Sequence, residues 1–187
     1  MSTEQQVIRL AQALSGQWTV PILLAMDRVR GRFTPLQHEL QIAPARLSDN
    51  LKRMTEAGLV THLSPHERRH PALPEYVLTE HGLLLRDAAQ AQQAAEQALG
   101  YGRLSAKAWS MPVLLALHYR HERFNQIAHA LEQVTPRMLS KRLDELHSLG
   151  AVDKQLDGQA RPSFLYGLER ASQPPVRQLA VDLVSIV

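Results

Sequence analysis

The sequence predicts a mainly helical protein with small β-hairpins, built as two tandem copies of one domain and joined by a long helix. The first observation is a repeated apolar octet, because WTVPILLA at residues 18–25 returns as WSMPVLLA at 109–116. The second is that LSDNLKRMTEAGLV at 47–60 aligns with LSKRLDELHSLGAV at 139–152. Each copy spans roughly 75 residues, which favours duplication of a small domain over a solenoid of three or more shorter units.

Each copy is expected to begin with a buried helix that contains the apolar octet. Thr19 and Ser110 can cap these two helices, and Pro21 and Pro112 then fall in the first turn, where a missing N–H costs nothing. A short helix comes next in the first copy. Its start at Thr34, with proline next and glutamine three residues on, resembles a capping box.

The following helix is expected to begin at Pro44 or Pro136 and to stop at Gly58 or Gly150, since glycine is common just past a helix C-terminus. Two helices joined by a tight turn have helix-turn-helix geometry. LVTHLS and EYVLT in the first copy, and a run with an Asp157-Gly158 turn in the second, predict a two-stranded hairpin. This order of elements is that of a winged helix-turn-helix domain, present twice.

We expect a first winged-helix domain with an N-terminal helix over 1–85, a helical linker over 86–104, and a second winged-helix domain with a C-terminal helix over 105–187. The linker contains AAQAQQAAEQAL, which is rich in helix-forming residues, and Gly100 should end the linker helix. Apolar stripes along the two terminal helices leave two options open. These helices pack within the chain, or they form a homodimer.

The second helix of each helix-turn-helix pair is expected to face double-stranded DNA. Its leucines recur with helical spacing and form a core stripe, which leaves polar side chains on the other side. The candidate DNA-binding residues on these helices are Arg46, Ser48, Asp49, Asn50, Lys52 and Arg53 in the first copy, and Arg137, Ser140, Lys141 and Arg142 in the second. Basic residues gather in the N-terminal half, which enters the major groove in helix-turn-helix proteins.

The segment HERRH at 66–70 spells the His-Glu-x-x-His zinc signature, which works only on a helix. Prolines bracket this segment, and they disfavour helical geometry. Because it falls between two hairpin strands, we interpret it as a wing tip whose Arg68 and Arg69 reach phosphate or the minor groove. A solvated basic loop is the alternative, and no metal site is expected. Lys154 and Arg161 are the candidates in the second wing.

The segments GQWTVPILLAM, FTPLQHEL, APARLSDNLKRMTEAGLV and PALPEYVLTEHG resemble, in this order, the HxlR-type family of bacterial winged-helix transcription regulators. The second copy resembles it through WSMPVLLAL, TPRMLSKRLDELHSLGAV and YGL. The resemblance implies sequence-specific DNA binding, usually by a homodimer on a near-palindromic site. Many members carry a sensing cysteine, which this chain lacks, and members normally have one domain. Since the two recognition faces here differ, we predict an asymmetric site.

The composition excludes several classes of function. With 44% apolar and 21% charged residues among 187, the chain is expected to fold as a globular protein. The absence of cysteine removes thiol chemistry, and its apolar runs are too short to span a bilayer. The start MSTEQQ lacks the pattern of a secretion signal, so we expect a cytoplasmic, nucleoid-associated protein and no membrane partner.

We find no phosphate-binding loop, dinucleotide fingerprint or catalytic triad, so no enzyme activity and no cofactor are expected. Most of the 21 basic residues are arginines, which suit bidentate contacts with phosphate or guanine. Together with the winged-helix pattern, the resemblance implies a transcription regulator, which we expect to act as a repressor. Two alternatives stay open: a non-specific damage-response or chromosome-organising DNA-associated protein, and a protein-binding tandem winged-helix module.

Overall fold

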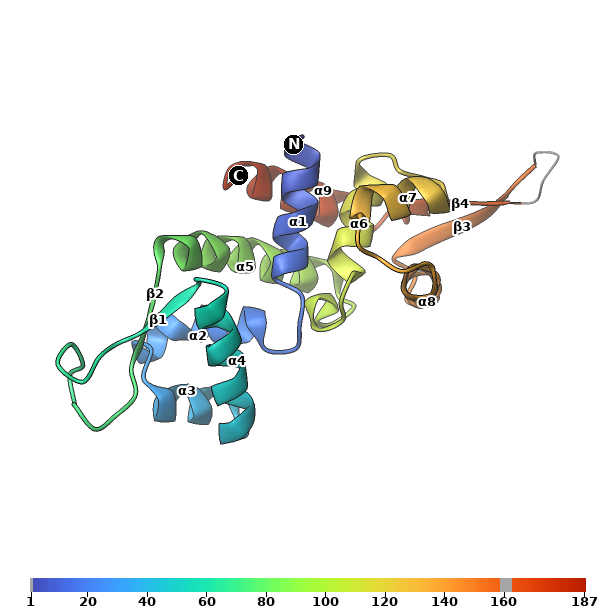
Figure 1. Ribbon diagram of the computed structural model, residues 1–187. Coiled ribbons are helices and arrows are strands. Elements are labelled where there is room, and N and C mark those ends of the chain that lie inside the picture. Colours follow the sequence, from blue (N-terminus) through green and yellow to red (C-terminus); the bar gives the residue numbers. More distant parts are fainter. Residues whose placement is uncertain (1, 159–162) are drawn as a thin grey trace. The chain divides into compact units, whose positions relative to one another are not determined.

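The computed structural model describes residues 2–158 and 163–187 and is mainly helical, with two antiparallel β-hairpins (Figure 1). The chain divides into two compact units. One consists of Gln17–Gln90, and the other combines the segment through Gly16 with Ala91–Val187. In the described part of the chain, no helix is both long and apolar enough to cross a membrane.

The unit Gln17–Gln90 contains one helix-turn-helix and one wing. Its elements are α2 (Thr19–Val29), α3 (Phe33–Leu40), α4 (Pro44–Glu56), β1 (Val60–His62), β2 (Tyr76–Leu78) and the first half of α5 (Glu80–Leu99). The core is formed where the three short helices meet, with Leu23, Leu36 and Leu51 fully buried. In the hairpin, Val60 lies opposite Leu78 and His62 opposite Tyr76.

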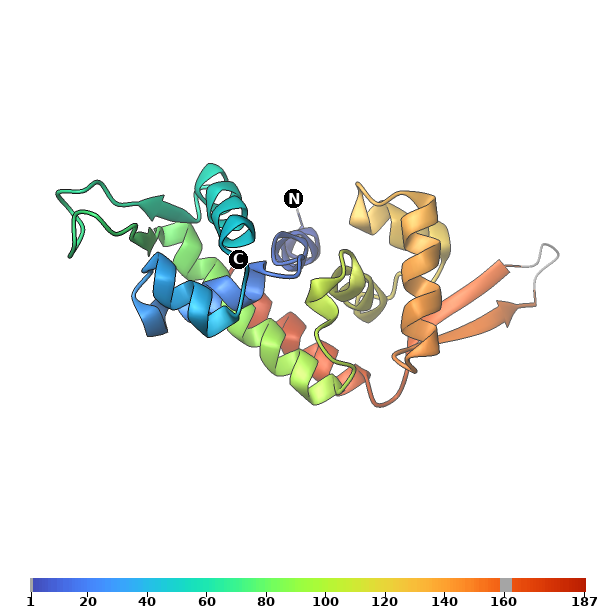
Figure 2. The ribbon, with the colours of Figure 1, turned by 90° about the horizontal axis from the view of Figure 1, so that it is seen from below.

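The other unit repeats this design around a central helix. Its elements are α1 (Thr3–Ala13), the second half of α5, η1 (Leu104–Ala106), α6 (Ser110–His118), α7 (Phe124–Leu131), α8 (Pro136–Ser148), β3 (Val152–Asp157), β4 (Ser163–Leu168) and α9 (Gln173–Val184). All of α6 before His118 is buried, because α1, α7, α8, α9 and β4 pack around it. Figures 1 and 2 show α1 and α9 beside α6.

Both copies add a short third segment to the hairpin, between the first two helices. The backbone N–H of Tyr76 donates to Gly31 O at 2.9 Å, and that of Tyr166 donates to Glu122 O at 2.8 Å. Gly31 has a φ of +65°, and a Cβ there would lie 1.7 Å from Tyr76 O, so only glycine fits. The sheet of each wing is thereby attached to the helix-turn-helix at an equivalent point.

The predicted starts of two helices and the predicted ends of three are confirmed. Helices α4 and α8 begin at Pro44 and Pro136. Gly58 and Gly150 follow them with φ values of +70° and +76°, the left-handed backbone that glycine adopts readily. The long helix α5 ends at Leu99, directly before Gly100 with a φ of +75°.

The predicted helix caps are wrong. Thr19 and Ser110 are the first residues of α2 and α6, and tryptophans occupy both N-cap positions without a side-chain capping bond. Helix α3 begins at Phe33, so Thr34 lies inside it. The reason is tertiary, because the Phe33 N–H already donates to Pro74 O at 3.2 Å and needs no side-chain acceptor.

Helix α1 belongs to the second unit, whereas the sequence predicts a first domain over residues 1–85 that includes this helix. Its apolar stripe, which includes Val7 and Ala11, is buried where α1 packs on α6, α7 and α9. An Arg9–Glu132 ion pair of 2.7 Å and a backbone hydrogen bond from Gly16 to Ser105 O of 2.8 Å add to this packing. The stripe of α1 therefore packs within the chain.

Candidate nucleic-acid interface

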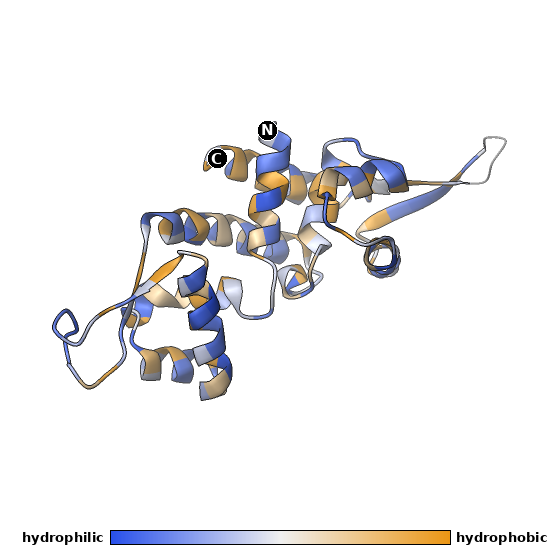
Figure 3. Cartoon of the chain, viewed as in Figure 1, coloured by the Kyte–Doolittle hydropathy of each residue, from blue (hydrophilic) through white to orange (hydrophobic). Residues whose placement is uncertain are grey.

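Helix α4 presents a polar face to solvent. Leu47, Leu51 and Met54 are buried, as their helical spacing predicts. The predicted residues that the structure leaves exposed on this helix are Arg46, Ser48, Asp49, Lys52 and Arg53. Figure 3 shows the visible side of α4 as mainly hydrophilic. With its N-terminal backbone N–H groups and three cations, this face can bind an anionic polymer.

Asn50 is not on this exposed face, contrary to the prediction. Its side chain is buried, and Nδ2 donates to Arg46 O at 2.7 Å. Its Oδ1 accepts a hydrogen bond from Arg53 Nη2 at 3.0 Å. Asn50 therefore orients Arg53 and leaves its own amide unavailable to a base edge.

Helix α8 presents a smaller polar face. Arg137, Ser140 and Lys141 are exposed, and Lys141 Nζ lies 4.0 Å from Glu145 Oε1. Arg142, which was predicted to contact DNA, is only 5% exposed. Its Nε donates to Ala108 O at 2.9 Å, and its Nη1 pairs with Glu145. Arg142 therefore anchors α8 to the segment before α6.

Helical geometry explains why Asn50 and Arg142 are buried. Arg142 follows Leu139 by three residues and precedes Leu146 by four, so it borders the buried stripe. Asn50 has the same relation to Leu47 and Met54 in the first copy. Two equivalent positions were thus assigned to the wrong side of their helices.

Glu145 is the residue that the sequence analysis missed. Burial opposes its ionisation, but a hydrogen bond from Lys107 and the charges of Arg142, Lys107 and Lys141 outweigh this and lower its pKa. Lys107 Nζ lies 3.2 Å from its Oε2. The spacing of four residues from Lys141 was the available sequence signal. This carboxylate lowers the positive charge that α8 presents to a ligand.

The first wing is a looped segment in which two arginines have different environments. The chain between β1 and β2 forms turns rather than a helix, as predicted for HERRH. Arg68 is half-buried, and it donates from Nε to Leu63 O at 2.7 Å and from Nη1 to Pro71 O at 3.2 Å. The Arg69 side chain is 55% exposed, with Nε 3.6 Å from Glu75 Oε1. Arg68 therefore holds the loop together, and Arg69 is the better placed to reach a ligand.

In the second wing, the Lys154 side chain is paired with other side chains of the same unit. Its Nζ lies 3.0 Å from Asp144 Oδ1 and 4.4 Å from the centre of the Phe164 ring. The hydrogen bond to Asp144 is the main cause of a raised Lys154 pKa. The other candidate, Arg161, lies outside the described residues. Carboxylates thus compensate most of the described basic candidates of the second copy.

The family comparison agrees with the duplicated architecture. The family model described as HxlR-like helix-turn-helix matches residues 13–98 and again residues 104–174. No curated protein and no solved structure matched the chain. The family consists of DNA-binding transcription regulators, and each match contains one helix-turn-helix and one hairpin. With both matches covering most of its length, this chain belongs to the HxlR-like helix-turn-helix family, in a tandem form.

Proposed function

We propose that this protein is a sequence-specific repressor that reads double-stranded DNA with α4 and α8, assisted by the wings, on the bacterial nucleoid. One observation carries the proposal: both helices expose an arginine in their first turn, Arg46 as the third residue of α4 and Arg137 as the second residue of α8. An arginine at this place can donate two hydrogen bonds to a guanine edge in the major groove. Lys52, Arg53 and Lys141 lie further along and suit contacts with phosphate.

The two helices contribute unequally in this proposal. In the part of the chain that the structure describes, Arg46 and Lys52 make no ion pair, whereas Lys141 and Lys154 each face a carboxylate. Binding of phosphate by Lys141 or Lys154 has to compete with that carboxylate, which weakens the contact. We therefore assign the larger share of affinity to α4 and the smaller share to α8.

The test is a selection from random duplexes at physiological salt, followed by titration of the selected duplex and a scrambled one. A sequence-specific regulator binds the selected duplex on the order of 1,000-fold or more tightly. Arg46→Ala should then weaken binding to the selected duplex by about 1–3 kcal/mol and relax the preference at one base pair. Arg103→Gln is the control, because Arg103 is exposed and lies outside both helices.

Two other results would overturn the proposal. Equal affinity for both duplexes, with a salt dependence set by phosphate contacts alone, would indicate a non-specific DNA-associated protein. Normal function of the Arg137→Ala and Lys141→Ala variants, without measurable DNA binding by the wild type, would indicate a protein-binding module. Repression itself is measured with a reporter promoter that carries the selected site.

We also propose that two chains associate through α9. Val176, Leu179 and Leu183 are buried in the unit, but Val181 and Val184 on the other side of α9 are 59% and 43% exposed. An exposed apolar strip on a helix suits contact with a second copy of itself. Size-exclusion chromatography with light scattering measures this directly.

A further inference from the structure

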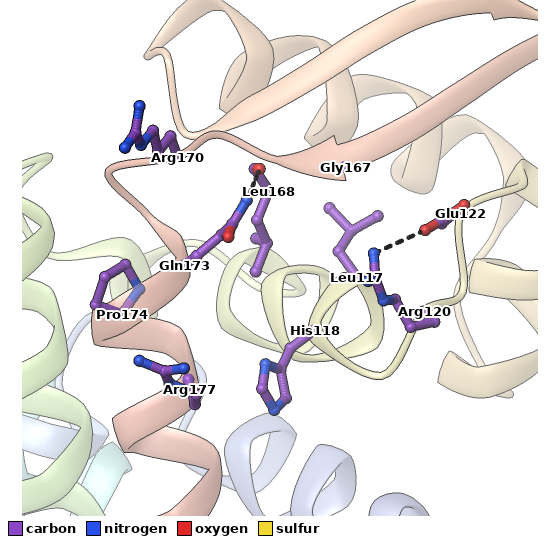
Figure 4. Close-up of a pocket in the computed structure, with 10 residues that line it drawn as sticks. All are labelled: Leu117, His118, Arg120, Glu122, Gly167, Leu168, Arg170, Gln173, Pro174 and Arg177. Carbon is purple, nitrogen blue, oxygen red and sulfur yellow. Dashed lines mark hydrogen bonds and ion pairs between the residues drawn. The ribbon is translucent and has the colours of Figure 1, made fainter.

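The second unit contains a pocket that shares no residue with the proposed DNA-binding surface. The end of α6, the turn before α7, the end of β4 and the start of α9 line it, and it is open to solvent (Figure 4). Its volume is about 580 Å³. Small-molecule sites usually measure ~300–1,000 Å³, so the pocket can hold a compact organic ligand.

The pocket is strongly basic. Arg120, Arg170 and Arg177 line it together with one carboxylate, Glu122. The Arg120–Glu122 contact is 3.3 Å long, but the Arg120 side chain is 86% exposed, so this pair neutralises the pocket weakly. Arg170 and Arg177 form no ion pair with any residue of the described ranges. Two guanidinium groups are therefore available to an anionic ligand.

His118 also lines the pocket, and the arginine charges act on its imidazole. Partial burial lowers its pKa, and the charges of Arg177 and Arg120 lower it further. The lowered pKa favours the uncharged imidazole at neutral pH, and its ring N–H can donate a hydrogen bond to an acid group of a ligand. Arg177 and Arg120 stay positively charged and can attract the same acid group.

Apolar side chains occupy the middle of the pocket. Leu117 and Leu168 lie between Arg120 on one side and the pair Arg170 and Arg177 on the other (Figure 4). Leu117 is already buried, whereas Leu168 is half-buried. An inorganic ion would contact an arginine but leave Leu168 uncovered, and a ligand with an apolar body and an acid group would cover Leu168 and pair with a guanidinium group together.

We propose that this pocket binds a small organic anion, in which an apolar or aromatic body carries a carboxylate or phosphate group. The acid group pairs with Arg177, which lies beside His118, and the body rests on Leu168, while Arg170 adds positive charge at another part of the pocket lining (Figure 4). This inference goes beyond DNA recognition and does not depend on it, because the site uses none of the proposed DNA contacts.

The test is isothermal titration of the full chain without DNA, using benzoate, phenyl phosphate, inorganic phosphate and the neutral benzyl alcohol. We expect benzoate or phenyl phosphate to bind and the other two to bind at least about tenfold more weakly, because they lack either the body or the charge. Arg177→Gln should weaken binding of the anion by about tenfold, and Arg170→Gln should weaken it by a smaller factor because Arg170 acts from farther away. Arg103→Gln removes the same charge outside the pocket and should leave the affinity within about twofold.

Several results would overturn the proposal. One is that neither aromatic anion gives heat of binding at millimolar concentration. Another is that inorganic phosphate or benzyl alcohol binds as tightly as the aromatic anions. A third is that Arg103→Gln weakens anion binding as much as Arg177→Gln does. Arg170 lies in an exposed turn, so its variant tests the site even where Arg177→Gln disturbs α9. A last outcome would assign Arg177 to DNA binding instead. In that case the wild type binds no aromatic anion, and Arg177→Gln weakens binding to the selected duplex as much as Arg46→Ala does.

Discussion

Arg137 and Arg142 lie on the same helix but have opposite roles. Arg137 is exposed, whereas Arg142 is buried with hydrogen bonds to the Ala108 carbonyl and Glu145. Arg142→Ala removes the side-chain donor to the Ala108 carbonyl and one of the three cations that pair with Glu145, so we expect the free energy of unfolding to fall by about 1–3 kcal/mol. Arg137→Ala should leave it within about 0.5 kcal/mol of wild type. Chemical denaturation followed by circular dichroism measures both.

DNA titration of the same two variants completes this comparison. Arg137→Ala should weaken binding to the selected duplex by about 1–3 kcal/mol. Arg142→Ala, titrated at a temperature where it is folded, should bind nearly as well as wild type. A folded Arg142→Ala protein with strongly reduced DNA affinity would contradict the anchoring role.

The neighbouring arginines of the first wing allow a second prediction. Arg68 donates to two loop carbonyls, Leu63 O and Pro71 O, so Arg68→Ala should open the loop. We expect faster amide hydrogen exchange across residues 63–73. Arg69→Ala should keep wild-type exchange there but weaken DNA binding, because its side chain is more exposed. Equal exchange in both variants would show that Arg68 does not hold the loop.

Periodicity explains which site residues could be predicted from the sequence. Arg46, Lys52 and Arg137 lie far from the leucine stripe of their helices, and the structure leaves them exposed. Asn50 and Arg142 lie beside the stripe, where a long or hydrogen-bonding side chain can turn either way. Residue spacing places them at the border of the stripe but does not show that a carbonyl is within reach, so the hydrogen bonds that hold them there could not be predicted.

At the scale of elements, the two copies differ in how their recognition helices are capped. Thr135 caps α8 by accepting a hydrogen bond from the Met138 N–H at 3.2 Å. The equivalent residue before α4 is Ala43, which has no side-chain acceptor. The same position therefore has a cap in one copy and lacks it in the other.

This difference predicts opposite effects of two substitutions. Thr135→Ala should destabilise the second unit by about 1 kcal/mol, because an N–H of α8 loses its acceptor. Ala43→Thr should stabilise the first unit by up to about 1 kcal/mol, since Ala43 is exposed and already has the extended backbone of an N-cap. Thermal unfolding shows the sign of each change. A lower melting temperature for Ala43→Thr would contradict the argument.

The order of the elements could be predicted because each local signal occurs twice, with proline and glycine marking the same helix ends in both copies. The start of α3 and the position of α1 could not. Phe33 begins its helix with a hydrogen bond to Pro74 O, about forty residues away in the sequence. The stripe of α1 fits many apolar surfaces, and only the assembled unit shows that α6, α7 and α9 cover it.

At the scale of the whole molecule, duplication places two unequal copies of the proposed DNA-reading helix in one chain. Tethering raises the effective concentration of the second helix to the millimolar range once the first has bound. The weaker α8 surface can therefore contribute without high affinity of its own. Because the exposed residues of α4 and α8 differ, one chain should recognise an element that is not palindromic.

The proposed α9 contact turns this into a prediction about the full site. A homodimer related by a two-fold axis presents the element twice in inverted order, so the wild type should select an inverted repeat of a non-palindromic element. Val181→Glu places a charge on the exposed strip of α9, and it should give a monomer that binds a single element. Light scattering gives the mass of each protein, and selection gives each sequence. If the monomeric variant selects an element that is itself palindromic, the two helices do not read different bases, and the asymmetric interpretation is wrong.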